Sequence, residues 1–143
     1  MKFKITIIFG LLVLMVSCDP EPDPIRGCTD PKSLNFNFSA TTDNGTCAYS
    51  TTTFYASVAY YSGIPITGID VYVHGNMVGV ISAVYPAGPG NCSAAGTVSY
   101  QFQDGNTVDW NTVVHLANGG QIFDSGIVSP NSAAACIKVN VTI

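Results

Sequence analysis

Two histidines and two aspartates are the residues of this sequence best suited to hold a transition metal. His74 and His115 fall at positions expected to point outward from β-strands, and so do Asp70 and Asp109. If their strands lay side by side, the four side chains could form a two-histidine, two-aspartate site, for which zinc is the natural ion. Two histidines 41 residues apart are a weak pattern, so solvent-facing polar side chains are the simpler interpretation.

Acid–base catalysis has little material in this chain. The aspartates Asp70, Asp104, Asp109 and Asp124 are scattered, and the only glutamate is Glu21. A glycosidase needs two carboxyl groups held about 5–10 Å apart in a cleft. The sequence also contains no nucleophile elbow, no phosphate-binding Gly-rich loop, no HExxH and no CxxC. We therefore predict that this protein is not an enzyme.

A segment near the N-terminus carries five oxygen-bearing side chains that calcium could use. Ca²⁺ takes six to eight oxygen ligands, but the spacing here lacks the D-x-[DN]-x-[DN]-G loop and its distant glutamate. Asp and Asn side chains also bond to nearby backbone in turns. Scaffolding of turns is therefore the main interpretation and calcium the alternative. The five residues are Asp30, Asn35, Asn37, Asp43 and Asn44.

The N-terminus decides the compartment in which these residues work. Lys2 and Lys4 precede an apolar run, residues 5–16, which is followed by Ser17 and Cys18. This run is too short for the ~20-residue helix that spans a hydrocarbon core, whereas its length suits a secretory signal. The sequence therefore predicts export.

The segment Met15-Val16-Ser17-Cys18 resembles a bacterial lipobox, with Met where Leu is usual. This resemblance to bacterial lipoproteins implies that residues 1–17 are removed and that Cys18 is acylated, palmitate included, which ties the protein to a membrane through two or three chains. Residues 18–26 are acidic and proline-rich and are expected to form a polyproline II tether. Acidic residues after the cysteine resemble the surface-export signals of Bacteroidota lipoproteins. That implies an outer-membrane protein facing the cell exterior, with a plain solvated linker as the alternative.

Four cysteines remain once Cys18 is assigned to lipid. An exported compartment permits disulfides, and four cysteines allow three pairings. Order along the chain favours Cys28–Cys47 and Cys92–Cys136, each within one expected unit. The chain-entropy model gives about 3 kcal/mol for the shorter loop and about 4 kcal/mol for the longer one.

Composition limits the remaining possibilities. The 126 residues after position 17 suffice for one domain and a small appendage, and their three cations stand against nine acids, a net charge near −6. That balance argues against a nucleic-acid partner. Only 10% of all residues are charged, too few for long amphipathic helices, and this is typical of extracellular all-β modules.

Residues 27–49 resemble a short module common in Bacteroidota surface proteins, written Gly-Cys-Thr-Asp-Pro, Asn-Tyr-Asn, Ala-Thr and Asp-Asp-Gly-Ser-Cys. Here Phe36 replaces the usual Tyr, Asn44 the second Asp and Thr46 the Ser. The resemblance implies a lineage and a small disulfide-closed loop module, but no activity. The other matching positions are Gly27, Cys28, Thr29, Asp30, Pro31, Asn35, Asn37, Ala40, Thr41, Asp43, Gly45 and Cys47.

Residues 52–143 alternate between apolar and polar side chains over several segments, which indicates half-buried antiparallel strands. Along one segment Val108, Trp110, Val114 and Leu116 share a parity. Hairpin signals such as Asn118-Gly119-Gly120 separate the segments. We predict an all-β domain, a seven-stranded antiparallel immunoglobulin-like β-sandwich, with an open barrel as the alternative. The expected strands are 53–61, 68–74, 77–84, 95–102, 107–116, 121–129 and 136–142.

The same stretch resembles uncharacterised β-sandwich domains of Bacteroidota lipoproteins, through VYVHGNMVGVI, Cys92, DGNTVDW and Cys136-Ile-Lys-Val-Asn-Val. This resemblance implies no characterised activity.

Four tyrosines are the candidate binding residues, because parity places them outward or in loops. Exposed aromatic rings stack on sugars or anchor protein partners, although packing beneath the tether and the small module is the alternative. We expect a non-catalytic cell-surface lipoprotein that presents a binding or structural module. The other readings are a carbohydrate-binding lipoprotein for polysaccharide capture and an accessory subunit of an outer-membrane assembly. The tyrosines are Tyr55, Tyr61, Tyr72 and Tyr85.

Overall fold

The computed structural model describes residues 21–143. The expected signal (1–17), Cys18 and the first tether residues lie outside the described residues. The described part is all-β, and no helix that could span a membrane occurs in it. Its strands are β1 (Arg26–Gly27), β2 (Thr42–Asp43), β3 (Thr51–Ala56), β4 (Tyr60–Tyr61), β5 (Ile64–Val73), β6 (Asn76–Ile81), β7 (Val98–Gln101), β8 (Val108–Leu116), β9 (Gln121–Val128) and β10 (Cys136–Val141).

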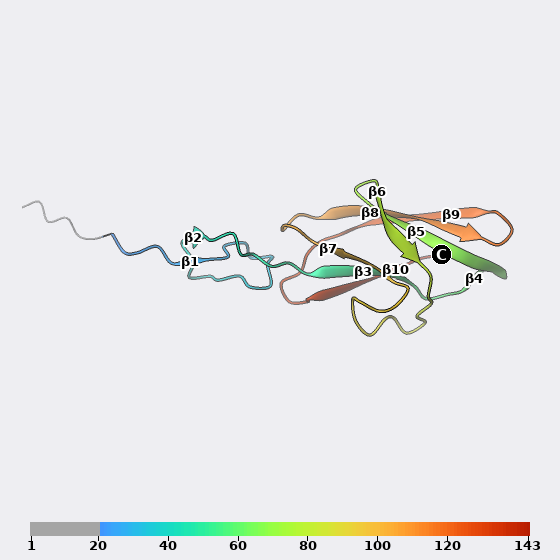
Figure 1. The fold of residues 1–143 in the computed structure, drawn as a ribbon, viewed down its shortest axis with the longest axis horizontal. Coiled ribbons are helices and arrows are strands. Elements are labelled where there is room, and N and C mark those ends of the chain that lie inside the picture. The colour runs from blue at the N-terminus through green and yellow to red at the C-terminus, as the bar shows by residue number, and fades with distance from the viewer. Residues whose placement is uncertain (1–20) are drawn as a thin grey trace, which may run out of the picture.

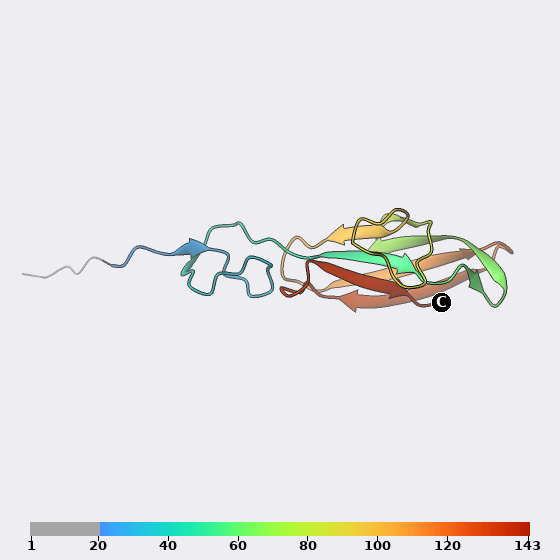
Figure 2. The same ribbon diagram turned by 90° about the horizontal axis from the view of Figure 1, so that it is seen from below.

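The strands form one small sheet and two larger ones. β1 and β2 pair in a small module, while β10-β3-β7 and β4-β5-β8-β9 form the three-stranded and five-stranded sheets of the main domain, with β6 also paired to β5. The tether, the small module and the main domain follow one another along the long axis of the molecule (Figures 1 and 2).

The core lies between the two larger sheets. Phe54 of β3 and Trp110 of β8 are both buried, with ring centroids 5.5 Å apart and planes at 57°. Along β8 every second residue is buried, which confirms the parity predicted for Val108, Trp110, Val114 and Leu116. Alternation works here because β8 lies inside its sheet with one face on the core.

The first expected strand, 53–61, is wrong as a single element. Residues 57–59 carry the chain from the three-stranded sheet to the five-stranded sheet, so β3 and β4 belong to different sheets and the main domain has eight strands. The two-residue turn Ser62-Gly63 between β4 and β5 has φ of 48° and 82°, values that suit a tight hairpin. The sequence does not show this turn or the crossing between the sheets, because the apolar alternation continues without a break through residues 54–60.

The expected all-antiparallel pairing is also wrong at one place. β10 pairs with β3 in parallel, from Cys136↔Thr51 to Val141↔Ala56, although β3 and β7 are antiparallel. The first and last strands of the domain therefore lie side by side and run in the same direction. Alternation reports which face a residue occupies, not which strand lies beside it, so the sequence could not reveal this pair.

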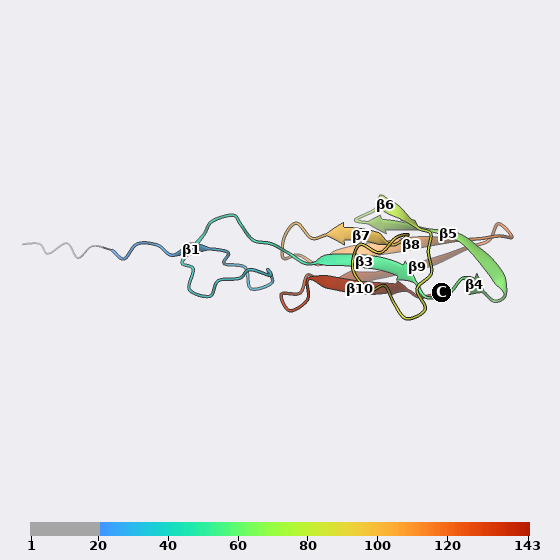
Figure 3. The same cartoon turned by 60° about the horizontal axis from the view of Figure 1, so that its bottom comes forward.

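The proline-rich segment between β6 and β7 covers the outer side of the three-stranded sheet (Figure 3). Tyr85 donates its N–H to the carbonyl of Ala56 at 2.8 Å, and Cys92 is joined to Cys136 at the start of β10. Beneath this segment Thr53 is fully buried although its parity points away from the core. The disulfide therefore holds a long crossover against the sheet.

Candidate functional site

The two histidines and two aspartates form two separate pairs on the outer face of the five-stranded sheet, the face turned away from the core. His115 Nε2 lies 2.9 Å from Asp70 Oδ2, and His74 Nδ1 lies 2.7 Å from Asp109 Oδ1. Asp109 and His115 both lie on β8, six positions apart, which is about 20 Å at the rise of a strand. Within residues 21–143 no three His, Cys, Asp or Glu side chains are grouped to hold a metal. The four-ligand zinc hypothesis is therefore wrong, because the two His–Asp pairs lie at different positions along β8, too far apart to bind one ion.

The five calcium candidates act as acceptors inside the small module. The Oδ1 atom of each of the five side chains accepts a backbone N–H. In four of the five residues the donor lies two residues further along the chain, as in Asx turns. Asn35 instead accepts the N–H of Ala48 across the module, at 2.8 Å. These contacts support the scaffolding interpretation. The four local turns are made by Asp30, Asn37, Asp43 and Asn44.

The four candidate tyrosines do not share one surface. Tyr55 lies beneath the proline-rich segment, where a Cβ on Gly88 would stand 3.4 Å from its hydroxyl, and Tyr85 donates its hydroxyl to the carbonyl of Ala95 at 2.6 Å. Tyr72 is half-buried on the five-stranded sheet, opposite Met77. Tyr61 alone of the four is exposed, at 39%. The four candidates therefore do not form a single aromatic face, because they are distributed over both sheets and the proline-rich segment.

The sequence reasoning missed Tyr60, the most exposed tyrosine at 61%. Tyr60 has the same parity as the core residue Phe54, so alternation along residues 54–60 does not identify it as exposed. Because β4 is a two-residue strand at the margin of the five-stranded sheet, both Tyr60 and Tyr61 face solvent.

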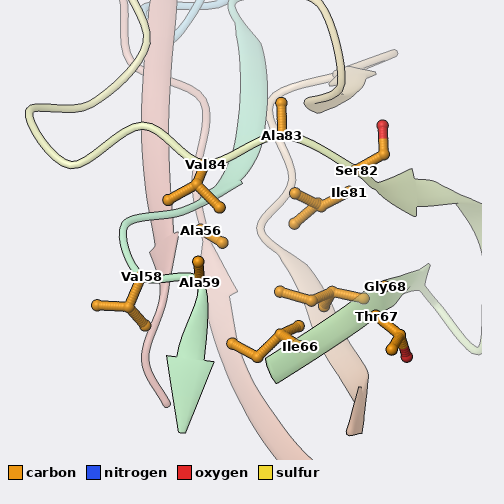
Figure 4. Close-up of a pocket in the computed structure, with 11 residues that line it drawn as sticks. Ala56, Val58, Ala59, Ile66, Thr67, Gly68, Ile81, Ser82, Ala83 and Val84 are labelled. Atoms are coloured by element: carbon orange, nitrogen blue, oxygen red, sulfur yellow. The ribbon is translucent and has the colours of Figure 1, made fainter. Parts of the chain in front are cut away.

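One apolar pocket opens where β4 and β6 leave a gap along β5 (Figure 4). Its volume is about 70 Å³, far below the 300–1,000 Å³ typical of small-molecule sites. Ile66 and Gly68 line it from β5, and Ile81 and Val84 line it from the β6 side. The only side-chain polar groups in the lining are the hydroxyls of Thr67 and Ser82, so the pocket could take an apolar side chain but contains no titratable group.

A second surface that the sequence reasoning missed lies on β9. Phe123 and Ile127 are 70% and 76% exposed. Both belong to the outer face, where Phe123 stands opposite Val113 and Ile127 opposite Asp109. We call these two residues the β9 patch. Apolar residues occur at both parities of β9, so the sequence did not show which set faces water.

The small module meets the main domain through a polar junction. Lys32 of the module donates from Nζ to the carbonyl of Gly105 in the main domain at 2.7 Å. Within the module, Tyr49 donates its hydroxyl to Asp30 Oδ2 at 2.8 Å. A Cβ at Gly105 would collide with the Asp30 carboxylate, so any larger residue there would displace that side chain. Tyr49 also packs against the core of the main domain. The two units are therefore joined by side chains as well as by the connecting chain.

Asp30 and Tyr49 of this junction have shifted pKa values. The N–H of Lys32 and then the hydroxyl of Tyr49 stabilise the Asp30 carboxylate and lower the pKa of Asp30. The same bond to Asp30, with burial, raises the pKa of Tyr49 to about 12. The Asp30 contribution to stability is thus lost as pH falls through its lowered pKa, and that of Tyr49 is lost as pH rises through about 12.

Replacing Asp30 with asparagine is expected to bring the pKa of Tyr49 down towards the ordinary value of about 10. Asparagine keeps an acceptor for the Lys32 N–H but removes the negative charge that opposes tyrosinate formation. Ultraviolet titration of the tyrosines checks this, with Asp104→Asn as the control because Asp104 acts on Tyr49 only through its charge. An unchanged titration of Tyr49 in Asp30→Asn would show that the bond to Asp30 does not cause the shift.

Comparison with known proteins yields no relative: no family model, no curated protein and no solved structure matches this chain.

Proposed function

We propose that this protein is a non-catalytic surface lipoprotein that presents a β-sandwich of immunoglobulin-like type as a binding module. The observation that carries the proposal is the N-terminal order of two lysines, an apolar run of signal length, Ser17 and Cys18. In this proposal the acylated Cys18 anchors the chain in an outer membrane of Bacteroidota type, facing the exterior, and the acidic tether separates the module from the lipid.

The shape of the described part supports this proposal. The tether enters the small module at the end away from the main domain (Figure 1). The bond from Lys32 to Gly105 and the packing of Tyr49 against the core join the module to the main domain. An anchor at Cys18 would therefore place the β4–β5 hairpin among the parts farthest from the membrane, since this hairpin lies at the opposite end of the long axis (Figure 2).

Two observations support the immunoglobulin-like assignment. The first and last strands of the domain lie together in one sheet, and the Trp110 ring crosses the core to contact Phe54 of the other sheet. Two sheets that enclose such a core form a sandwich.

A protein partner is favoured over a sugar. Sugar binding would require a planar row of exposed rings, but the exposed tyrosines are confined to Tyr60 and Tyr61 of one short strand. The other exposed large side chains of the outer face are mostly aliphatic, and exposed apolar surface of this kind marks protein interfaces. They are Met77, Val80, Phe123 and Ile127. The role of accessory subunit in an outer-membrane assembly agrees with this surface, and polysaccharide capture is the second reading.

Changing Cys18 to serine is expected to release the protein from the membrane fraction into the soluble fraction, because serine offers no thiol for the acyl group. The measurement is fractionation of the expressing cells together with the intact mass of the extracted protein. The wild-type mass should equal that of an acylated chain beginning at Cys18, with four cysteines blocked until reduction. A wild-type chain without lipid would contradict the proposed function.

A further inference from the structure

β9 is an edge strand with little of the usual protection against pairing. It is the last strand on its side of the five-stranded sheet within residues 21–143, and it follows β8 over eight residue pairs without a register shift. Edge strands are commonly protected by Lys, Pro, bulges or short length. β9 has no Lys, no Pro and no bulge, whereas β7 has only four residues and β10 carries Lys138. Its one charge is Asp124, which has the core-facing parity and already accepts two backbone N–H groups.

The backbone groups that face this free edge can be identified. The N–H of Ser125 donates to the carboxylate of Asp124, its chain neighbour, at 2.9 Å. Because alternate residues of a strand direct their N–H and C=O to the same side, the odd-numbered residues of β9 present theirs to the free edge. These are the residues whose side chains lie on the outer face, including Phe123 and Ile127.

The sequence of β9 is self-complementary in one antiparallel register. Pairing Ser125 with Ser125 of a second copy sets Phe123 opposite Ile127 of that copy, and Ile127 opposite its Phe123, so both parts of the β9 patch are covered. A register centred on Asp124 would set two carboxylates face to face, and one centred on Gly126 would set Phe123 opposite Ser129. Apolar cross-strand pairs are favourable and like charges directly opposite are not, so the Ser125 register is preferred.

Asp124 is compatible with this register. Its Oδ2 accepts the N–H of Thr142 at 2.8 Å, and that bond can persist on pairing while the N–H of Ser125 transfers to the second copy. In the Ser125 register Asp124 lies opposite Gly126 of the second copy, which has no side chain to compete for its space.

We propose that two copies of this chain associate through β9, antiparallel about a two-fold axis at Ser125, to form one continuous sheet. This inference deepens the proposed function by naming its protein partner as a second copy, and one consequence rests on the lipid anchor. The strands run along the long axis of the molecule (Figure 2). A two-fold axis perpendicular to them therefore places the N-terminal ends of the two copies at opposite ends of the dimer. Lipid-anchored copies on facing surfaces could pair in this way, whereas copies upright in one membrane could not.

Disulfide trapping of Ser125→Cys tests the pairing. Opposed residues in a hydrogen-bonded antiparallel pair have Cα atoms about 5.5 Å apart, within the 4.4–6.8 Å range of disulfides. The matched control is Gln121→Cys on the same strand and face, since its own counterpart would lie about 27 Å away. Each variant of the full chain, purified in nonionic detergent, is oxidised mildly and analysed on non-reducing gels.

We expect Ser125→Cys to form the covalent dimer at least about tenfold faster than Gln121→Cys, because only its thiols meet in this register. Adding Phe123→Lys should abolish that advantage, and adding Val80→Lys on β6 should not. Equal rates for the two cysteine variants would overturn the proposal, as would an advantage that Phe123→Lys leaves intact. Mass spectrometry that finds Cys28–Cys47 and Cys92–Cys136 both formed in a variant shows that this variant has folded. The test takes place in solution, so its failure would leave the Cys18 result unaffected.

Discussion

Replacing Phe54 with alanine is expected to lower the free energy of unfolding by about 3–5 kcal/mol, the range for large aromatic residues in cores. Phe54 has no exposed surface and packs against Trp110 across the two sheets. Alanine would leave a cavity at the contact that joins the sheets, in a core that neighbouring side chains could refill only in part. Urea denaturation followed by tryptophan fluorescence measures the loss, because the chain has a single tryptophan.

Phe38→Ala is the matched control for this prediction. Phe38 lies in the small module and is 87% exposed, so its removal should change the stability by less than about 0.5 kcal/mol. A loss of similar size in the two variants would mean that the contact between Phe54 and Trp110 does not hold the sheets together.

Removing the second disulfide with Cys92→Ser and Cys136→Ser is expected to destabilise the main domain by about 4 kcal/mol in the chain-entropy model. The bridge closes 44 residues of sequence and fastens the proline-rich segment to β10. Without it Thr53 and Tyr55 would lose part of their cover, so proteolysis near Cys92 should accelerate. Calorimetry and limited proteolysis measure the two effects.

The paired variant Cys28→Ser with Cys47→Ser provides the comparison. This bridge closes 19 residues within the small module, so the expected loss is about 3 kcal/mol and confined to that module. The tryptophan transition should then stay near its wild-type midpoint. Coincident unfolding of both units in this variant would show that the junction at Asp30, Lys32 and Tyr49 couples them into one cooperative unit.

The proposed pairing through β9 and the proposed anchor involve different parts of the molecule. Pairing requires the β9 patch to be free, and the described part leaves Phe123 and Ile127 largely exposed. The tether and the small module lie at one end of the molecule (Figure 1), so neither covers the length of β9. A protein partner is therefore compatible with the proposed anchor, and the cysteine variants at positions 18 and 125 separate the two proposals.

The sequence by itself determined most of the longer strands, the hairpin after β8 and the favoured pairing of the cysteines. Alternation located β8 and its buried residues because a strand with one face on a core must repeat every second residue. The disulfides follow the order of the cysteines because each pair lies within one unit, Cys28 with Cys47 and Cys92 with Cys136. Local chemistry was enough for these features.

Only the tertiary structure decided which strands are neighbours and which polar residues meet. The parallel pairing of β3 with β10, the crossing between β3 and β4, and the separation of the two His–Asp pairs all depend on contacts between distant segments. Period-two patterns identify faces but carry no information about partners. For the same reason the sequence does not show which face of β9 is exposed. That follows only from the pairing of β9 with β8 on one edge and the absence of a strand within residues 21–143 on the other.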